Sequence, residues 1–279
     1  MDHGQRLRDG KSVMVRVRQA AVAGCTLMLA AGAAEAARGP SCPPIITACG
    51  CAITKAGTYT VANELTASQS TQDVCIEITA SYSILNLKGF ALVGDGDGIG
   101  IAIRNGVTHA VVVGGDEGPA TPPDDAGTND QDFPSAQAVV TRWDVGIQDE
   151  GDYSFIALFR DLGGNIFQQT GNATAGILFK GAKNSVAGDF RAAFNGQAGV
   201  IVRNSSGVRL FNLSAINNRQ TGVWFDHSDD GVLSTATAAS NDQYGIWLFS
   251  ASRNLITDCN GTTGNGDTGI LLGDRKSVV

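Results

Sequence analysis

The sequence predicts an all-β protein, built as a single-stranded parallel β-solenoid with coils of about 23 residues. The first observation is a glycine that returns after 23, 23, 23 and 24 residues and opens the same five-residue phrase each time. The phrases are GILFK, GVIVR, GVWFD, GIWLF and GILLG, which begin at Gly176, Gly199, Gly222, Gly245 and Gly269. The second observation is that each phrase alternates inward and outward positions with period two, which is typical of a strand. A short strand at a fixed period indicates coils that lie about 4.8 Å apart and pair through their backbones.

Residues 1–36 are predicted to be a signal peptide, with Met14 as the more typical start. Two arginines precede an apolar run at residues 20–33, and the small-x-small sequence after it fits cleavage before Ala37. The run is shorter than the roughly 20 residues of a membrane span, so no span is predicted. A lipid anchor at Cys25 is an alternative, but almost no apolar stretch precedes that cysteine. We therefore expect a secreted, periplasmic or cell-surface protein.

Residues 37–56 are predicted to form an N-terminal cap segment that contains cysteines. Cys51 and Cys75 are 24 residues apart, which is one turn of the solenoid, so they are expected to stack and form a disulfide. A Cys42–Cys49 bridge is a second candidate. The alternative is a zinc site, although one residue between Cys49 and Cys51 is not the usual ligand spacing.

The β-helix is predicted to cover residues 57–273, and its later repeats align in columns. Two apolar columns are expected to line the core: Ile177, Val200, Val223, Ile246 and Ile270, and then Phe179, Val202, Phe225, Leu248 and Leu272. A third contains Phe190, Leu213, Ala236 and Cys259, which makes Cys259 a buried thiol rather than a ligand or nucleophile. A polar column of Asn195, Asn218 and Asn241 predicts amide side chains that hydrogen-bond from coil to coil.

The earlier coils are less regular, but they carry an opening pattern. It consists of Gly57, Tyr59 and Val61, then Ile76 and Ile78, then Leu85, Leu87, Gly89, Leu92 and Gly94. On this pattern residues 45–273 resemble secreted right-handed parallel β-helix proteins with a pectin-lyase-like fold. The resemblance implies a right-handed helix. It does not fix the activity, because such helices host lyases, hydrolases, epimerases, tailspikes and adhesins.

Residues 116–135 interrupt the pattern with four prolines and six acidic residues. They are predicted to form a loop that projects from the coil. No cofactor is predicted, with calcium as the alternative. The candidate calcium ligands in this loop are Asp124, Asp125, Asp130 and Asp132. Asp95 and Asp97 in GDGDG are a second set, for which an Asp-Gly turn is the other explanation.

The outward positions carry the main functional prediction. One outward ladder contains Leu178, Ile201, Trp224, Trp247 and Leu271, and the ladder beside it contains Lys180, Arg203, Asp226 and Phe249. Trp224 and Trp247 on adjacent coils are expected to form a flat aromatic face on which a sugar docks, with the indole N–H as a donor. Arg203, Lys180 and His227 are the predicted polar ligand-binding residues. The alternative is an apolar stripe that is covered by a loop, a further segment or a second subunit.

Three carboxylates near this face, Asp226, Asp229 and Asp230, are the predicted catalytic residues if the protein is an enzyme. A glycoside hydrolase needs a carboxylic acid and a carboxylate, and a polysaccharide lyase needs a base for which Lys180 and Arg203 are candidates. The alternative is a salt-bridge ladder without catalysis. The hydrolase signatures of similar β-helix proteins, an Asn-Thr-Asp run, a Gly-His-Gly and an Arg-Ile-Lys, are absent from the sequence.

Charge narrows the class of partner. The chain has 20 basic and 27 acidic residues. Residues 1–36 hold five of the basic and three of the acidic ones, so the rest of the chain has 15 basic and 24 acidic residues and a net charge of −9. This net charge argues against nucleic acid or an anionic membrane surface as a partner. The predicted function is binding of a polysaccharide or surface glycan, with a carbohydrate-active enzyme and a structural surface protein as alternatives. Residues 274–279, DRKSVV, match a translated sequencing adapter and are predicted to be a non-native tail after a truncated helix.

Overall fold

A computed structural model of the chain describes residues 39–67, 73–115, 138–163, 171–259, 262–273 and 277, without the side chains of residues 160 and 161. The chain divides into two units, Met1–Ala36 and Ala37–Val279. The first unit, where the signal peptide is predicted, lies outside the described residues, as does most of the predicted tail. Within the second unit the chain winds into a parallel β-solenoid, and the described part contains no helix long and apolar enough to span a membrane.

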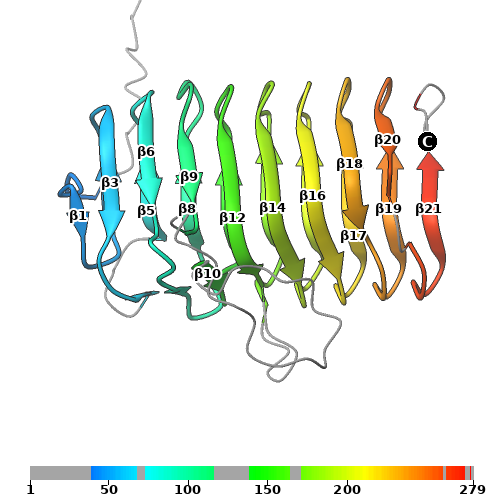
Figure 1. The fold of residues 1–279 in the computed structure, drawn as a ribbon, viewed down its shortest axis with the longest axis horizontal. Coiled ribbons are helices and arrows are strands. Elements are labelled where there is room, and N and C mark those ends of the chain that lie inside the picture. Colours follow the sequence, from blue (N-terminus) through cyan, green and yellow to red (C-terminus); the bar gives the residue numbers. More distant parts are fainter. Residues whose placement is uncertain are drawn as a thin grey trace, which may run out of the picture. The chain divides into compact units, whose positions relative to one another are not determined.

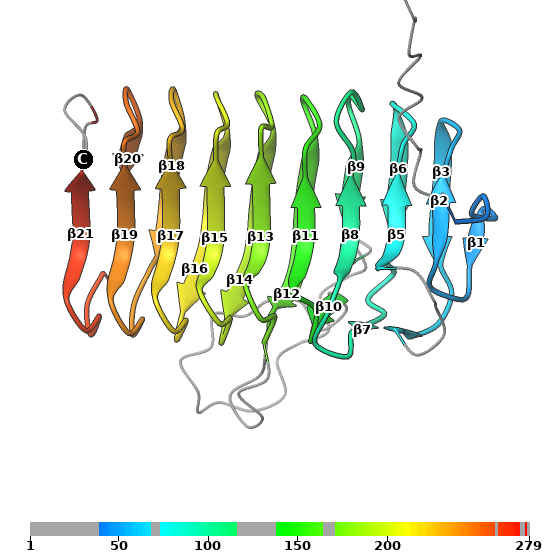
Figure 2. The same cartoon turned by 180° about the vertical axis from the view of Figure 1, so that it is seen from behind.

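Each coil contributes one strand to a nine-stranded sheet, called sheet A here, which lies behind the strands that face the viewer in Figure 1. In order, its strands are β2 (Cys51–Ile53), β5 (Val74–Ile78), β8 (Ile99–Ile103), β11 (Val145–Asp149), β13 (Ala175–Lys180), β15 (Ala198–Arg203), β17 (Thr221–Asp226), β19 (Tyr244–Phe249) and β21 (Thr268–Gly273). Neighbours in this order pair in parallel, so the coils follow one another along the sheet in sequence order (Figure 2).

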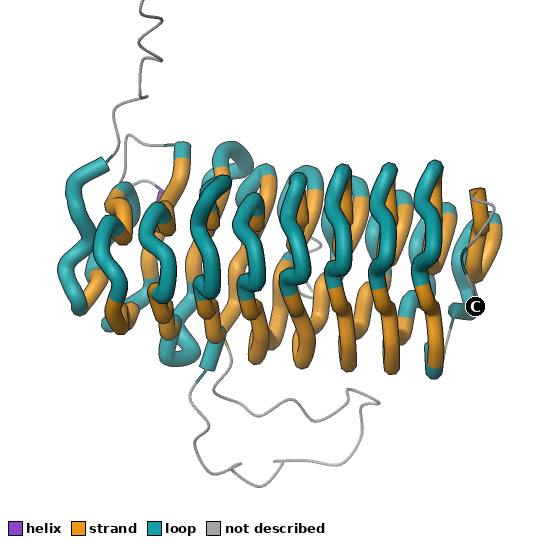
Figure 3. Tube along the Cα trace, turned by 90° about the horizontal axis from the view of Figure 1, so that it is seen from above, coloured by secondary structure: helices purple, strands orange, loops and turns teal. Residues whose placement is uncertain are grey.

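The other strands form a twelve-stranded sheet, called sheet B, across the core from sheet A (Figure 3). Its main path is β1 (Ile45–Ile46), β3 (Gly57–Val61), β6 (Ser83–Asn86), β9 (Val111–Val113), β12 (Phe155–Leu162), β14 (Val186–Ala193), β16 (Arg209–Ile216), β18 (Val232–Thr237) and β20 (Leu255–Thr257). Off this path β7 (Leu92–Val93) pairs with β4 (Leu65–Thr66) and β10 (Ala138–Thr141), and β10 also pairs with β12.

The core lies between the two sheets, and the predicted inward columns are confirmed up to β19; in β21 the predicted core residue Leu272 pairs in register with Leu248 but is 43% exposed. The register pairs Ile177 with Val200, Val223 with Ile246 and Ile246 with Ile270, so equal offsets lie directly above one another. All but Ile270, in the last described coil, are fully buried. Apolar side chains that repeat at each coil remove a continuous strip of surface from water, and this burial is the main term that holds the coils together.

The asparagine column is confirmed as a buried hydrogen-bonded ladder, and it is longer than predicted. Asn195 Nδ2 donates to Asn218 Oδ1 at 3.0 Å, and Asn218 Nδ2 donates to Asn241 Oδ1 at 3.0 Å. Asn172 and Asn265 extend it by one coil at each end. Each ladder oxygen also accepts the backbone N–H of the preceding asparagine, so one side chain satisfies several buried polar groups at the turn.

The predicted Cys51–Cys75 and Cys42–Cys49 disulfides are wrong, because the structure pairs Cys42 with Cys51 and Cys49 with Cys75. The register explains the error: Cys51 lies opposite Ile76, so Cys75 falls one position short of it. A shift of one residue in a strand turns the side chain to the other face. The remaining described cysteine, Cys259, is free, packs against the core and is only half-buried, and this burial raises the pKa of its thiol.

One charged side chain lies inside an apolar column. Asp149 pairs in register with Phe179 and is fully buried. Its Oδ1 accepts the backbone N–H of Gly151 at 2.9 Å and the hydroxyl of Ser154 at 3.0 Å, whereas Oδ2 has no hydrogen-bond partner. Burial raises the pKa of Asp149 to about 6, because a carboxylate is costly to remove from water.

Candidate functional site

The sequence-predicted ligand residues meet on the outer surface of β15, β17 and β19. The register places Trp224 beside Trp247 in one outward ladder. In the next ladder it places Arg203 beside Asp226, and Asp226 beside Phe249. We call this surface the aromatic face. It comprises Arg203, Trp224, Asp226, His227, Tyr244, Trp247 and Phe249.

The two tryptophans do not form the flat outward face that the sequence predicts. Their ring centroids are 4.9 Å apart and their planes differ by 10°, so the rings stack on each other. Strands in a sheet are about 4.8 Å apart, and planar rings in register at that spacing cover one another's faces. The Arg203 guanidinium carbon lies 5.2 Å from the Trp224 ring centroid, and the Trp224 Nε1 is buried without a partner. Trp224 is therefore a supporting ring and not the predicted donor.

The exposed part of the aromatic face is made by rings that tilt against this stack. Tyr244 lies 5.3 Å from Trp247 at 46°, and Phe249 lies 5.6 Å from Trp247 at 55°. His227 meets Phe249 in an edge contact at 5.5 Å. Phe249 is 42% exposed, so the solvent meets a corrugated surface of ring edges and tilted faces.

A charged network borders these rings. The Arg203 Nε donates to Asp226 Oδ2 at 2.7 Å, and Asp226 Oδ1 lies 2.7 Å from His227 Nδ1. The Asp226 side chain is only 12% exposed, whereas that of His227 is 55% exposed. Lys180 pairs instead with Glu150, at 3.4 Å, and so does not join the network. Both carboxylate oxygens of Asp226 are thus engaged, and this engagement fixes the His227 ring at the edge of the aromatic face.

The other two predicted catalytic carboxylates also have partners. Asp229 Oδ1 accepts the N–H of Ser252 at 2.8 Å and its hydroxyl at 2.7 Å. Asp230 binds Arg253 through both oxygens at 2.7 Å, and this guanidinium lowers the pKa of Asp230. A general acid in glycoside hydrolysis needs the opposite shift. The contacts therefore favour structural roles for Asp229 and Asp230, and catalysis by them stays a prediction.

The outward apolar ladder on the preceding coils is buried. Leu178 and Ile201 are 8% and 1% exposed, and they form a cluster with Ala175 and Ala198 against which Trp224 packs. The burial of Leu178 and Ile201 agrees with the alternative of a covered apolar stripe for this part of the ladder. The rings of the aromatic face begin at Trp224 in the next coil.

No metal centre emerges from the described residues, which contain no group of three or more His, Cys, Asp or Glu side chains placed to hold an ion. Asp95 accepts the backbone N–H of Asp97 at 3.5 Å, as in an Asp-Gly turn. Asp124, Asp125 and the rest of the acidic loop lie outside the described residues.

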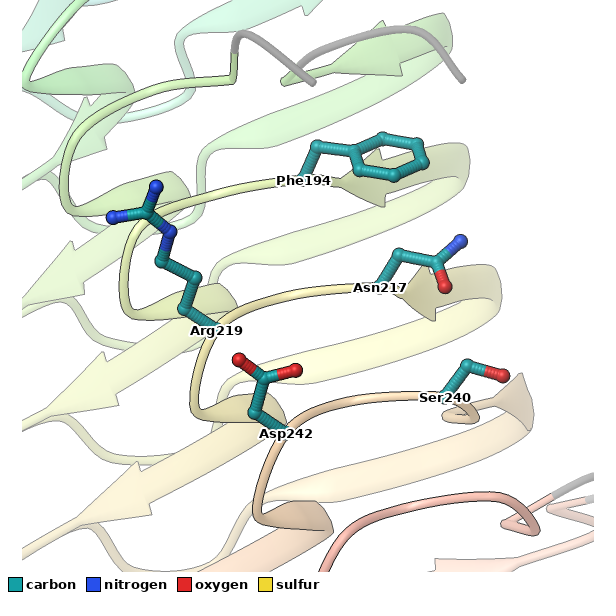
Figure 4. Close-up of a pocket in the computed structure, with 5 residues that line it drawn as sticks. All are labelled: Phe194, Asn217, Arg219, Ser240 and Asp242. Carbon is teal, nitrogen blue, oxygen red and sulfur yellow. The ribbon is translucent and has the colours of Figure 1, made fainter. Parts of the chain in front are cut away.

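The sequence analysis missed a hollow on another edge of the solenoid, which we call the turn groove. A cavity of about 290 Å³ is lined by Phe194, Asn217, Arg219, Ser240 and Asp242 (Figure 4). An adjoining cavity of about 340 Å³ shares Phe194 and Arg219 and adds Arg142. Phe194, Asn217 and Ser240 take the same position in three successive coils. Their φ angles are 59°, 55° and 56°, and this left-handed backbone conformation bends the chain just before each asparagine of the ladder. None of the predicted ligand residues lines this groove.

A second missed feature is an exposed stack of three rings, formed by Tyr82, His109 and Tyr153. The centroids of His109 lie 5.0 Å from Tyr82 and 5.3 Å from Tyr153, with planes 8° and 11° apart. Each residue has φ of 58° at the turn before sheet B, and the two tyrosines are 65% and 54% exposed. In the sequence this stack is marked by a recurring triplet of an aromatic or histidine ring, a small residue and an apolar residue. The triplets are YSI at 82–84, HAV at 109–111 and YSF at 153–155.

Comparisons with known proteins give one family model and a few solved structures that are similar to the chain. Residues 144–279 match the family model described as right handed beta helix region. No curated protein matches the sequence. Among solved structures, the Dettilon tailspike protein gp208 is similar at a TM-score of 0.49 and 12% identity, over 76% of this chain and 46% of that one.

Tailspike protein 2 of the Escherichia coli O157:H7 bacteriophage CAB120 is similar at a TM-score of 0.42 and 9% identity, over 84% of this chain and 38% of that one. The A-module of the mannuronan C-5 epimerase AlgE4 of Azotobacter vinelandii follows at a TM-score of 0.36 and 10% identity, over 84% and 78%. The chain spans less than half the length of the two tailspike chains. Within the described residues the chain forms a parallel β-solenoid, and its residues 144–279 are similar to the family described as right handed beta helix region.

Proposed function

We propose that the protein binds a polysaccharide or surface glycan on the aromatic face. The observation that carries the proposal is the gathering of five rings and two charged groups on one outer surface over β15, β17 and β19. Sugars pack their C–H surfaces on aromatic rings, and a few polar groups at the border fix their orientation.

The partly exposed rings give this surface its shape. The ring planes of Phe249 and Tyr244 are inclined to that of Trp247 by 55° and 46°, so a sugar ring meets inclined ring faces rather than a flat platform. Trp224 stacks on Trp247 from the neighbouring strand, and the Arg203 guanidinium lies over Trp224. No described residue bonds the terminal Nη groups of Arg203, which are free to donate to hydroxyl oxygens.

The charge of the aromatic face favours a neutral glycan. Arg203 and Asp226 compensate each other at 2.7 Å. Binding should therefore depend little on salt, because no net charge is neutralised in the complex. The two disulfides of the cap segment support export, since such bonds persist in oxidising compartments.

Affinity electrophoresis against soluble polysaccharides, guided by a glycan array, tests the proposal. Trp247→Ala and Phe249→Ala should each weaken retention by about tenfold, which is the loss of one good ring contact. Tyr153→Ala is the matched control, because it removes an exposed ring from another surface. Unchanged retention of Trp247→Ala and Phe249→Ala would remove the aromatic face as the binding surface.

A further variant separates this surface from the turn groove. Arg219→Ala should leave retention unchanged, and a loss with this variant alone would place the glycan in the groove instead. If no glycan on the array is bound at all, the structural alternative is favoured.

A further inference from the structure

We propose that Asp226 and His227 form a proton-transfer dyad that hydrolyses carboxylic esters, such as O-acetyl groups, on the glycan held by the aromatic face. The inference rests on the proposed function for its substrate, but the dyad itself is defined by contacts within the chain.

The contact with Asp226 fixes the tautomer of the His227 imidazole. Asp226 Oδ1 lies 2.7 Å from His227 Nδ1, so the neutral ring donates its Nδ1–H to the carboxylate and keeps Nε2 as an acceptor. No described residue hydrogen-bonds Nε2, and the side chain is 55% exposed. A carboxylate on Nδ1 orients the ring and stabilises the imidazolium that forms when Nε2 takes a proton.

The dyad is also held rigidly. Asp226 is the last residue of β17, it pairs in register with Arg203 and Phe249, and Arg203 Nε holds its second oxygen at 2.7 Å. The edge contact of the His227 ring with Phe249 restrains the ring from the next coil. A base supported on strands keeps its geometry better than one on a free loop.

Arg203 is the group that faces the negative charge of the oxyanion formed in the reaction. The Arg203 guanidinium lies over the Trp224 ring and bonds Asp226 only through Nε. Its Nη groups have no partner among the described residues, and a fixed cation beside the base stabilises the oxyanion of a tetrahedral intermediate. The described carboxylates of this surface are all engaged, which leaves the imidazole as its free base.

The reaction then balances without a further reagent. A water molecule attacks the ester carbonyl carbon while its proton passes to His227 Nε2, and the oxyanion forms beside Arg203. The intermediate collapses, the bond between the acyl carbon and the sugar oxygen breaks, and that oxygen takes the proton from the imidazolium. The products are the carboxylic acid and the free sugar hydroxyl. Removing a proton from water suits an imidazole base near neutral pH.

The test measures acetate release from O-acetylated xylo-oligosaccharides and hydrolysis of p-nitrophenyl acetate by the full chain. Wild type should show saturable turnover, and His227→Gln should lower kcat by about 100-fold, the usual contribution of general-base catalysis. His109→Gln is the matched control, because His109 is the other exposed histidine among the described residues and is far from the dyad in the coil order. Equal rates of wild type and His227→Gln, or an equal loss in His109→Gln, would overturn the proposal.

Asp226 is a positioning residue, so its test needs a different readout. Asp226→Asn should lower kcat and leave KM unchanged, and Asp226→Glu should restore part of kcat. A change in KM alone would contradict the dyad. New reducing ends or an unsaturated sugar in place of acetate would also overturn ester hydrolysis. Retention of the deacetylated oligosaccharide by the wild-type protein distinguishes the two proposals, because binding to the aromatic face then stands whether or not the ester is hydrolysed.

Discussion

The N-terminal coils at residues 39–115 and the C-terminal coils at residues 171–273 share parallel pairing but differ in what fixes one coil on the next. In the first region the disulfide Cys49–Cys75 joins residues 37–56 to the next coil, and Cys42–Cys51 closes a loop within residues 37–56. In the second, the described residues contain no disulfide, and the asparagine ladder crosses the turns. A side-chain ladder requires the same offset in every coil, which only the regular repeats supply, whereas a disulfide tolerates coils of unequal length.

The surfaces of the two regions differ in a related way. Both carry stacked rings, because parallel register brings equal positions together at about 4.8 Å. The stack of Tyr82 and His109 in the first region continues to Tyr153 in the next coil; it lies at a turn, and no ion pair between described residues involves it. The stack of Trp224 and Trp247 lies on strands beside a charged network. Polar groups held against rings are what a binding surface needs, and only the second stack has them.

The largest effect is expected from breaking the ladder. Asn218→Ala leaves the N–H of Asn195 and the carbonyl of Ala192 without their partners inside the turn. Each buried unsatisfied group costs about 1–3 kcal/mol, so the free energy of unfolding should fall by about 4 kcal/mol. Urea unfolding measures it, with the exposed Asn105→Ala as a control that stays within about 0.5 kcal/mol. Similar losses for the two variants would mean that the ladder does not stabilise the C-terminal coils.

The disulfides give the next largest effect. Removing Cys49–Cys75, which closes 26 residues, should cost about 3.5 kcal/mol, and removing Cys42–Cys51, which closes 9, about 2.6 kcal/mol. Paired Cys→Ser variants, followed by hydrogen exchange, should lose protection in the N-terminal coils first. Cys259→Ser should leave exchange there unchanged. Uniform loss of protection along the whole solenoid would contradict a local staple.

Asp149, between the two regions, should make stability depend on pH. Its folded pKa of about 6 lies above the ordinary 3.8, so the folded state holds the proton more tightly between these values. Stability should therefore fall as pH rises from about 4 to about 6, by roughly 3 kcal/mol in all. Asp149→Asn should remove this decline and be the more stable protein at pH 8. Parallel unfolding profiles of the two proteins would show that Asp149 does not cause the decline.

The regular coils could be predicted because their period is constant. A fixed repeat of 23 residues is enough to place Val200, Val223 and Ile246 in one column, and the register bears this out. The same reasoning failed at Cys51 and Cys75, where the coil is one residue longer than the spacing of the cysteines. In a strand an error of one residue moves a side chain from the inner to the outer face of the sheet. The repeat period alone therefore does not predict which cysteines pair.

The sequence predicts which residues belong to the candidate site, but not how their side chains are oriented. Alternation along β17 and β19 fixes that Trp224 and Trp247 point outward, which the structure shows. The direction of a ring plane depends on the strand spacing and on neighbours such as Arg203, and neither enters a pattern of inward and outward positions. The turn groove was missed because its walls come from bends rather than strands.

The smallest effect would sharpen the comparison of the two ring stacks. Tyr82, His109 and Tyr153 are separated by 27 and 44 residues, so no period in the sequence reveals that they touch. Double-mutant cycles with leucine should give a coupling of about 0.5–1 kcal/mol for His109 with Tyr153, and almost none for Tyr82 with Tyr153, because His109 lies between them. The cycle for Trp224 with Trp247 should give the larger value, since these rings are less exposed and water competes less for their faces. Equal coupling in both stacks would mean that register alone sets the interaction, and that the charged surroundings of the tryptophans add nothing to it.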